Sequence, residues 1–246
     1  MSRIQLQPQL HDLKNWAALA FEQGLFFEPL AAFPFSDEEC GQLAQTGLVS
    51  ALHGAFIDVN PASGDAELRA LSQKRCEDSC RLAKRLGADA VVFHSSCFPF
   101  LRGSYLAQWA DCCGAYYSAL AERWQLSVLI ENAADVDPEP LAALMAHCSP
   151  QVGVCLDIGH ANYSRCTPEV WFDALGSNIR HLHLSDNLGS FDDHLPLGRG
   201  TVDWKKIDAL FRRAGTVERL TLEVGDTDGV RASLDYLRQN HLFGLE

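Results

Sequence analysis

The chain has 246 residues, of which 47% are hydrophobic and 21% charged, so it can bury a large core and suits one domain better than two small ones. Its 20 basic and 32 acidic residues give a net charge of −12, which disfavours nucleic acid as a partner, because phosphate backbones are bound by clustered lysine and arginine. We therefore expect a single domain over residues 1–246.

The N-terminal residues 1–16 lack the apolar centre of a signal peptide, and no window approaches the roughly 18 apolar residues of a membrane span. The nine cysteines are an odd number without a CxxC pair, which indicates reduced core thiols rather than disulfides or a zinc knuckle. Cys97, just past a predicted strand, could instead line a site. We expect a cytoplasmic protein with no membrane partner.

Eight short apolar runs are predicted to be strands, and each is followed by a polar loop and an amphipathic segment. The runs are residues 4–7, 25–28, 49–53, 90–94, 127–131, 153–157, 179–184 and 220–223. The amphipathic segments, predicted to be helices, are residues 13–23, 37–45, 66–86, 105–124, 140–147, 168–175, 204–214 and 230–240. Eight strand–helix units in 246 residues predict an α/β fold, a single (β/α)8 TIM barrel. A doubly wound open sheet is the alternative, but it usually has fewer units and a glycine-rich first turn.

In such a barrel the chemistry lies at the C-terminal ends of the strands. Charged or imidazole residues stand at or next to most of these ends: Glu28, His53, His94, Glu131, Asp157, His183 and Glu223. Such groups are rarely buried without partners, so we expect a site where the strand ends meet.

The densest stretch of such residues is 179–200, IRHLHLSDNLGSFDDHLPLGRG, which holds three of the nine histidines. The alternation at its start places His181 and His183 on one face of a strand. The loop that follows returns Asp192 and His194 toward the same end of the barrel. We expect His181 to be a barrel-interior residue and the other three to belong to the site.

His160 joins the set because it follows Asp157 by three residues and can fold back over the same opening. The converging residues are His53, His94, Glu131, Asp157, His160, His183, Asp192, His194 and Glu223. A mixed shell of nitrogen and oxygen donors suits manganese, cobalt, zinc or iron, whereas the imidazoles disfavour calcium.

These motifs resemble the xylose-isomerase-like barrel superfamily, which joins sugar isomerases and epimerases to the type IV apurinic endonucleases. The matching pieces, between residues 49 and 225, are His53-Gly54-Ala55-Phe56 with Asn60-Pro61, Val92-Phe93-His94, Glu131-Asn132, residues 155–160 (CLDIGH), residues 181–186 (HLHLSD), and Glu223. The resemblance implies a TIM barrel and, by the family's habit, a homodimer.

For the isomerases and epimerases, the resemblance implies one divalent ion, such as manganese, cobalt, zinc or magnesium, and two glutamates that act as acid and base. The positions that match these ligands are Glu131, Asp157, His183 and Glu223, and the two glutamates are Glu131 and Glu223. The trinuclear zinc endonucleases use further positions, which match His53, His94, His160, Asp192 and His194. All of these positions carry ligand-type residues, so the ligand types alone do not exclude a di- or trinuclear zinc phosphoester hydrolase.

Two features favour the isomerase or epimerase over the hydrolase. The strand-end loops carry few cations but several aromatic residues, namely Phe56, Phe98, Phe100 and Tyr163, which suit a small ligand with an apolar face, such as a sugar. Arg199 stands where the endonucleases tend to have an acidic residue.

We therefore expect a metal-dependent isomerase or epimerase that acts on a small sugar, sugar phosphate or sugar-like carbonyl compound through an enediolate. His160 would orient a substrate hydroxyl, and His194 or Arg199 could bind a more distant oxygen or a phosphate. A sugar-acid lyase or dehydratase is a further alternative, because it too stabilises an enolate.

Overall fold

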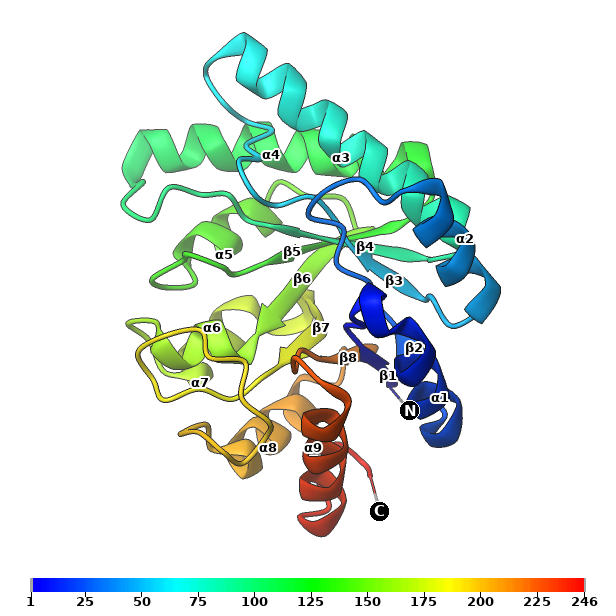
Figure 1. Cartoon of the computed structure of the whole chain (residues 1–246). Helices are drawn as coiled ribbons and strands as arrows, with labels where there is room; N and C mark the ends of the chain where they lie inside the picture. Colours follow the sequence, from blue (N-terminus) through cyan, green and yellow to red (C-terminus); the bar gives the residue numbers. More distant parts are fainter. Residues whose placement is uncertain (1, 246) are drawn as a thin grey trace.

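The computed structural model describes residues 2–245, and its centre is a ring of parallel strands (Figure 1). The strands are β1 (Arg3–Leu6), β2 (Phe26–Phe27), β3 (Ala51–His53), β4 (Ala90–His94), β5 (Ser127–Glu131), β6 (Val152–Asp157), β7 (Ile179–Leu184) and β8 (Arg219–Leu222). Their order in the sheet is β2-β1-β8-β7-β6-β5-β4-β3. Single bridges from Phe27 to Val49 and from Leu30 to His53 join the β2 side to the β3 side, so the ring is nearly closed.

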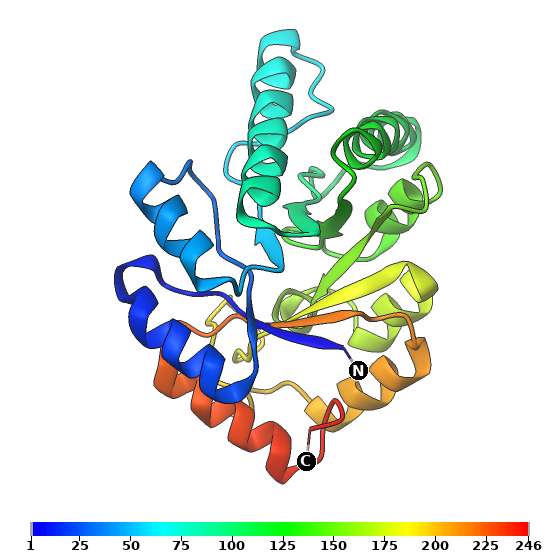
Figure 2. The ribbon, with the colours of Figure 1, turned by 90° about the vertical axis from the view of Figure 1, so that its right-hand side faces the viewer.

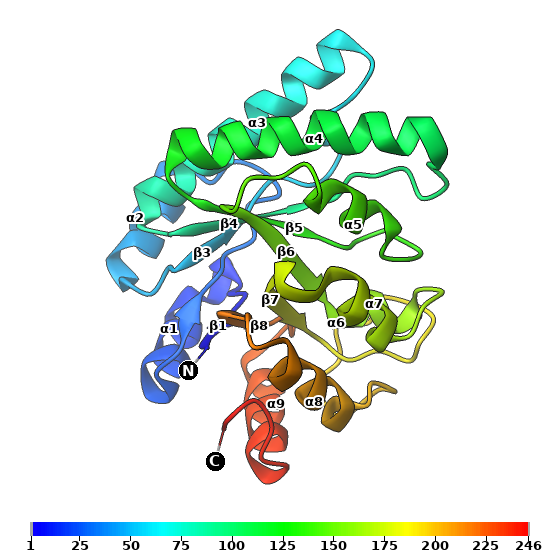
Figure 3. The same cartoon turned by 180° about the vertical axis from the view of Figure 1, so that it is seen from behind.

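Helices cover the outside of this ring, as the view in Figure 2 and the reverse view in Figure 3 show. They are α1 (Leu13–Gln23), α2 (Asp37–Thr46), α3 (Ala66–Leu86), α4 (Gly103–Trp124), α5 (Glu139–Met145), α6 (Ile158–Tyr163), α7 (Pro168–Leu175), α8 (Trp204–Ala214) and α9 (Thr227–Gln239), with 3-10 turns at Leu10–Asp12 and Gly176–Asn178. Ser36 begins α2 with a capping box to Glu39, and Asp65 caps α3. The predicted (β/α)8 barrel is confirmed.

The short helix α6 is not predicted from the sequence. It begins directly after β6, where the side chain of Asp157 accepts a hydrogen bond from the backbone N–H of His160 at 2.5 Å. A helix of six residues shows too little periodicity to detect, and its cap is itself a predicted metal ligand. This cap turns His160 back over the barrel opening.

Strand register brings the polar residues together at one end of the barrel. His94 pairs with Glu131 between β4 and β5, and Asp157 pairs with His183 between β6 and β7. One layer deeper in the barrel, His181 is fully buried, as expected for an interior residue. The strand ends therefore form a layer of ionisable groups at one end of the barrel.

The cysteines of the chain are free thiols, and most of them are buried, as the sequence predicts. Among residues 2–245, no helix combines the length and the apolar character that a membrane crossing needs.

Candidate functional site

Glu131, the last residue of β5, lies at the centre of the site and is almost fully buried. Three imidazoles face its Oε2 atom: Nε2 of His53 at 3.1 Å, Nδ1 of His183 at 3.4 Å and Nε2 of His94 at 3.6 Å. On the other side, Nδ1 of His160 lies 3.4 Å from Oε1. Residues from four strand ends or the loops after them thus meet at one carboxylate.

Four residues offer ligand atoms that all lie within 4.8 Å of one another: Glu131, Asp157, His183 and Glu223. Nδ1 of His183 lies 3.2 Å from Oε1 of Glu223. This Nδ1 atom and Oδ2 of Asp157 are buried without a hydrogen-bond partner among the described residues. Buried polar atoms nearly always have a hydrogen-bond partner. Two unpaired ligand atoms in this buried cluster therefore fit a divalent cation held by the four residues.

The electrostatics of the cluster agree with this fit. Burial raises the pKa of Glu223 to about 7, and burial also raises the pKa of Asp157. Burial alone would raise the pKa of Glu131 too, but the neighbouring imidazoles of His183 and His94 hold it below its usual value. Crowded buried carboxylates resist ionisation together, and a bound cation would relieve that repulsion.

A second group of ligand-type residues lies on the rim. Oδ2 of Asp192 lies 3.2 Å from Nε2 of His160 and 3.1 Å from Nε2 of His194. The backbone oxygen of Asn132 holds Nδ1 of His160 at 2.6 Å, and that of Glu223 holds Nδ1 of His194 at 2.9 Å. Both imidazoles therefore present Nε2 to the same carboxylate.

The Asp192 carboxylate raises the pKa of His194 to about 9, and this histidine has a left-handed backbone with φ of 48°. Left-handed backbone is uncommon outside glycine and is maintained only where the surroundings require it. The loop after β7 is thus folded so that His194 faces the barrel opening.

The structure brings together every predicted ligand: His53, His94, Glu131, Asp157, His160, His183, Asp192, His194 and Glu223. Arg199 is different, since it is exposed and no hydrogen bond or ion pair of the described residues joins its side chain to these ligands. Its expected role in binding a distant oxygen or a phosphate stays a prediction.

Two contacts of the cluster are not predicted from the sequence. Glu28 stands at a predicted strand end but is not among the predicted converging residues, although its Oε1 lies 3.0 Å from Nε2 of His183. Gln7 ends the first predicted strand, and its Nε2 donates a hydrogen bond to Oε1 of Glu223 at 2.6 Å. Both residues end predicted strands, so the criterion that identifies the ligands, a polar residue at a strand end, also applies to them.

A cleft of about 410 Å³ opens beside His94 between the loops after β3, β4 and β5. Phe56 and Phe98 line it, and the ring centroid of Phe56 lies 4.5 Å from that of His94. Cys97 also lines this cleft. Burial raises the pKa of its thiol to about 12, which disfavours the reactive thiolate, so this side chain serves as part of the cleft wall. The cleft therefore places an aromatic surface beside His94.

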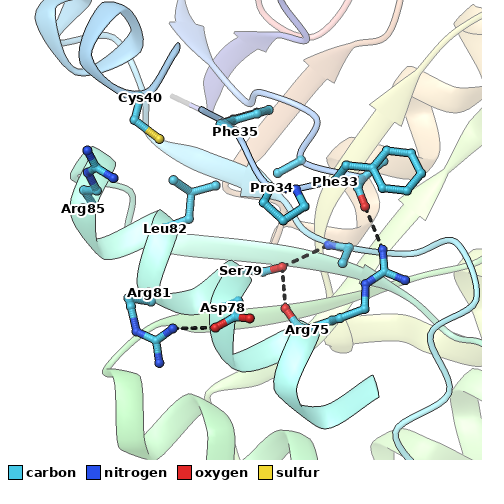
Figure 4. Close-up of a pocket in the computed structure, with 13 residues that line it drawn as sticks. Phe33, Pro34, Phe35, Cys40, Arg75, Asp78, Ser79, Arg81, Leu82 and Arg85 are labelled. Atoms are coloured by element: carbon cyan, nitrogen blue, oxygen red, sulfur yellow. Dashed lines mark hydrogen bonds and ion pairs between the residues drawn. The ribbon is translucent and has the colours of Figure 1, made fainter. Parts of the chain in front are cut away.

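Another cavity, of about 270 Å³, lies between residues 31–35 and helices α2 and α3 (Figure 4). None of the predicted ligands lines it. Arg75 points across it and donates to the backbone oxygen of Ala32 at 2.9 Å, and Arg81 is paired with Asp78. These two cations are thus engaged within the chain.

A family model described as "Xylose isomerase-like TIM barrel" matches residues 13–240. Among curated proteins, the uncharacterized protein MJ1311 of Methanocaldococcus jannaschii is 29% identical over 169 residues, which cover 63% of this chain and 57% of that protein. The match thus spans less than two thirds of that relative's length.

Solved structures with a similar backbone include a D-tagatose 3-epimerase-like protein, with a TM-score of 0.80, 23% identity and 96% of each chain covered. The TTHB071 protein from Thermus thermophilus, soaked with ZnCl2, has a TM-score of 0.78 and 24% identity, again with 96% of each chain covered. An L-ribulose 3-epimerase has a TM-score of 0.73 and 17% identity over 93% of this chain and 83% of that chain. At these identities the likeness is one of fold.

Proposed function

This chain belongs to the xylose isomerase-like TIM barrel family, and we propose that it is a divalent-metal-dependent isomerase or epimerase of a small sugar or sugar-like carbonyl compound. The observation that carries the proposal is the buried donor cluster of Glu131, Asp157, His183 and Glu223. Several solved structures with the same fold are of proteins named as sugar 3-epimerases or as similar to them, which supports the same reaction class.

In this reaction, Glu131 and Glu223 would move a proton at the carbon next to the substrate carbonyl. They stand on or just after β5 and β8, which are separated by β6 and β7, so they reach the substrate from different sides. A cation held by the cluster would supply a Lewis acid for the negative charge that develops as the proton leaves. One glutamate would remove the proton and the other would return it, on the same or the opposite face.

Burial suits Glu223 to this role, because it raises the basicity of a carboxylate oxygen that the cation leaves free. Gln7 would hold the Oε1 atom of Glu223 through its hydrogen bond. His160, fixed by the backbone oxygen of Asn132, would bind a substrate hydroxyl, and Phe56 would cover the apolar face of the sugar.

A second candidate function is a di- or trinuclear zinc phosphoester hydrolase. One observation favours it: His53 and His94 face the same oxygen of Glu131, and His160 and His194 face the same oxygen of Asp192, as shared metal ligands would. The net charge of −12 weighs against a nucleic-acid substrate.

Elemental analysis of the purified protein, of Glu131→Gln and of His94→Ala separates the two candidates. Glu122→Gln, a change at an exposed glutamate of α4, is the matched control. We expect about one ion per chain, as in other one-metal Lewis-acid sites, lost with Glu131 and retained without His94. Two or three ions per chain, with His94 needed for the additional ones, would overturn the one-metal proposal and direct the assays to phosphoesters.

The reaction itself is tested by incubating the metal-loaded protein with a panel of ketoses in deuterated water. An isomerase or epimerase of this type exchanges the proton that it moves, so deuterium at the reacting carbon, detected by NMR, is the expected result. If a ketose is converted to product but carries no deuterium at that carbon, the proton is not transferred through a glutamate whose carboxyl proton exchanges with water, and the proposed mechanism is contradicted.

A further inference from the structure

A network of buried polar side chains contacts His183 of the donor cluster. The proposed mechanism gives these side chains no role. The centre of this network is Glu28, which follows β2 and is fully buried. Oε1 of Glu28 lies 3.0 Å from Nε2 of His183. Oε2 accepts a hydrogen bond from the hydroxyl of Thr221 at 2.7 Å and lies 3.2 Å from Nε2 of His181. Each oxygen thus faces a donor on β7 or β8.

The contact with Glu28 decides which nitrogen of His183 carries the proton. A carboxylate can only accept, so the hydrogen must be on Nε2, the nitrogen that faces Glu28. In the neutral imidazole, the form that binds a cation, Nδ1 then has a free lone pair, and it is this atom that lies 3.2 Å from Glu223 and 3.4 Å from Glu131. The same imidazole is therefore bound at one end by Glu28 and free at the other end to bind a cation.

Thr221 fixes the orientation of the Glu28 carboxylate. Its hydroxyl has one proton, and Oε2 of Glu28, at 2.7 Å, is a nearer acceptor than Oε1 of Gln5, at 3.2 Å. The hydroxyl oxygen can then accept the hydrogen bond from Nε2 of His181 at 2.8 Å. Donors on both sides hold the carboxylate plane, so Glu28 cannot turn away from His183 without leaving buried polar atoms unsatisfied.

We propose that Glu28 is a positioning residue of the metal site, which holds His183 in the tautomer and orientation that direct Nδ1 toward the cation. This inference rests on the proposed function, since it needs a cation in the cluster of Glu131, Asp157, His183 and Glu223. Glu28 itself acts only through His183. Partners of this kind typically change metal affinity by about 10- to 100-fold.

The test is the zinc affinity of the full chain, measured by competition with a chromogenic chelator, for the wild type and for Glu28→Gln. Zinc is chosen because it is diamagnetic, so the protonated nitrogen of His183 can be identified by long-range ¹H–¹⁵N NMR on the same samples. We expect about 10- to 100-fold weaker zinc binding in Glu28→Gln, because the amide can also donate to Nε2 and so favour the wrong tautomer. Glu122→Gln, at an exposed glutamate, controls for loss of one charge.

Thr221→Val keeps Glu28 but removes the donor to its Oε2 atom, and it provides a milder variant if Glu28→Gln does not fold. We expect about 2- to 10-fold weaker zinc binding, the range that corresponds to one hydrogen bond. The tautomer of His183 should remain Nε2–H in this variant.

Three outcomes bear on the inference. Weaker zinc binding with a changed or mixed tautomer of His183 in Glu28→Gln supports it. Unchanged zinc affinity and tautomer in both Glu28→Gln and Thr221→Val, while the wild type binds zinc, overturn it but leave the proposed function standing. A wild type that binds no divalent cation overturns the proposed function and this role of Glu28 together.

Discussion

Nε2 of His53 lies 3.1 Å from Oε2 of Glu131, and both side chains are buried. Nδ1 of His183 lies 3.4 Å from the same oxygen, although it approaches from β7 rather than from β3. Glu131 is therefore shared between the four-residue donor cluster and a histidine outside it. Whether His53 binds a metal or only hydrogen-bonds to Glu131 distinguishes the two candidate functions.

The first prediction is that His53→Gln keeps the cation. Under the one-metal proposal, His53 supports Glu131 by a hydrogen bond, and a hydrogen bond to an ionised carboxylate contributes about 1.5 to 3 kcal/mol. We expect unchanged metal content by elemental analysis and a fall in kcat/KM of about 10- to 100-fold on an active ketose. Loss of one of several ions in this variant would instead indicate that His53 is a ligand.

The second prediction concerns the hydrogen bond from Gln7 to Glu223. Donation to a carboxylate stabilises its ionised form, so removing the donor in Gln7→Met should raise the pKa of Glu223. We expect the acidic limb of the kcat/KM profile to move to higher pH and kcat at pH 7 to fall by about tenfold. Gln42→Met, at an exposed glutamine of α2, is the control. An unchanged pH profile in Gln7→Met would show that Glu223 does not depend on this contact.

The strand ends explain how much of the site could be predicted from sequence. The apolar runs are short and are separated by clear helical segments, and a barrel brings the C-terminal ends of its strands together. The meeting of Glu131, Asp157 and Glu223 at one end of the barrel could therefore be predicted from the sequence. The separation of roles among the histidines could not, because it depends on which ring nitrogen faces which partner. The strand-end positions of Glu28 and Gln7 could have placed both residues near the site, but their contacts could not be predicted, because they too depend on which atoms face each other.

The third prediction concerns Asp186, which anchors the loop after β7. Its fully buried carboxylate accepts four hydrogen bonds, from the backbone of Asn187, Gly198 and Val202 and from the indole of Trp204, at 2.9 to 3.2 Å. In Asp186→Asn, the amide group would direct N–H donors at other N–H donors. We expect a loss of about 2 to 4 kcal/mol in the free energy of unfolding, measured in urea.

Asp228→Asn, at an exposed aspartate of α9, is the control for Asp186→Asn. Because Asp186 lies outside the donor cluster, the folded variant should retain the metal content of the wild type. A variant as stable as the wild type would show that the loop does not depend on these four hydrogen bonds.

The last prediction concerns the stability of the metal-free protein between pH 4 and 7. Asp135 is buried on the loop after β5, where its Oδ2 accepts hydrogen bonds from Ser95 at 2.7 Å and from the backbone of Ala133 at 3.2 Å. Burial raises its pKa to about 6 in spite of these bonds, compared with about 3.9 for an unfolded chain. The folded state therefore binds the proton more tightly than the unfolded state.

The sign of the pH dependence follows from this difference. The stabilisation from protonated Asp135 is complete below about pH 3.9 and is lost as the pH rises through about 6, because the folded protein must then bury a charge. Asp135→Asn cannot ionise and should lack this loss. Relative to the wild type, the variant should thus gain about 2 to 3 kcal/mol between pH 4 and pH 7, measured by urea unfolding with a chelator present. Asp111→Asn, at an exposed aspartate of α4, controls for the removed charge, and a constant difference between Asp135→Asn and the wild type at all pH values would contradict the raised pKa.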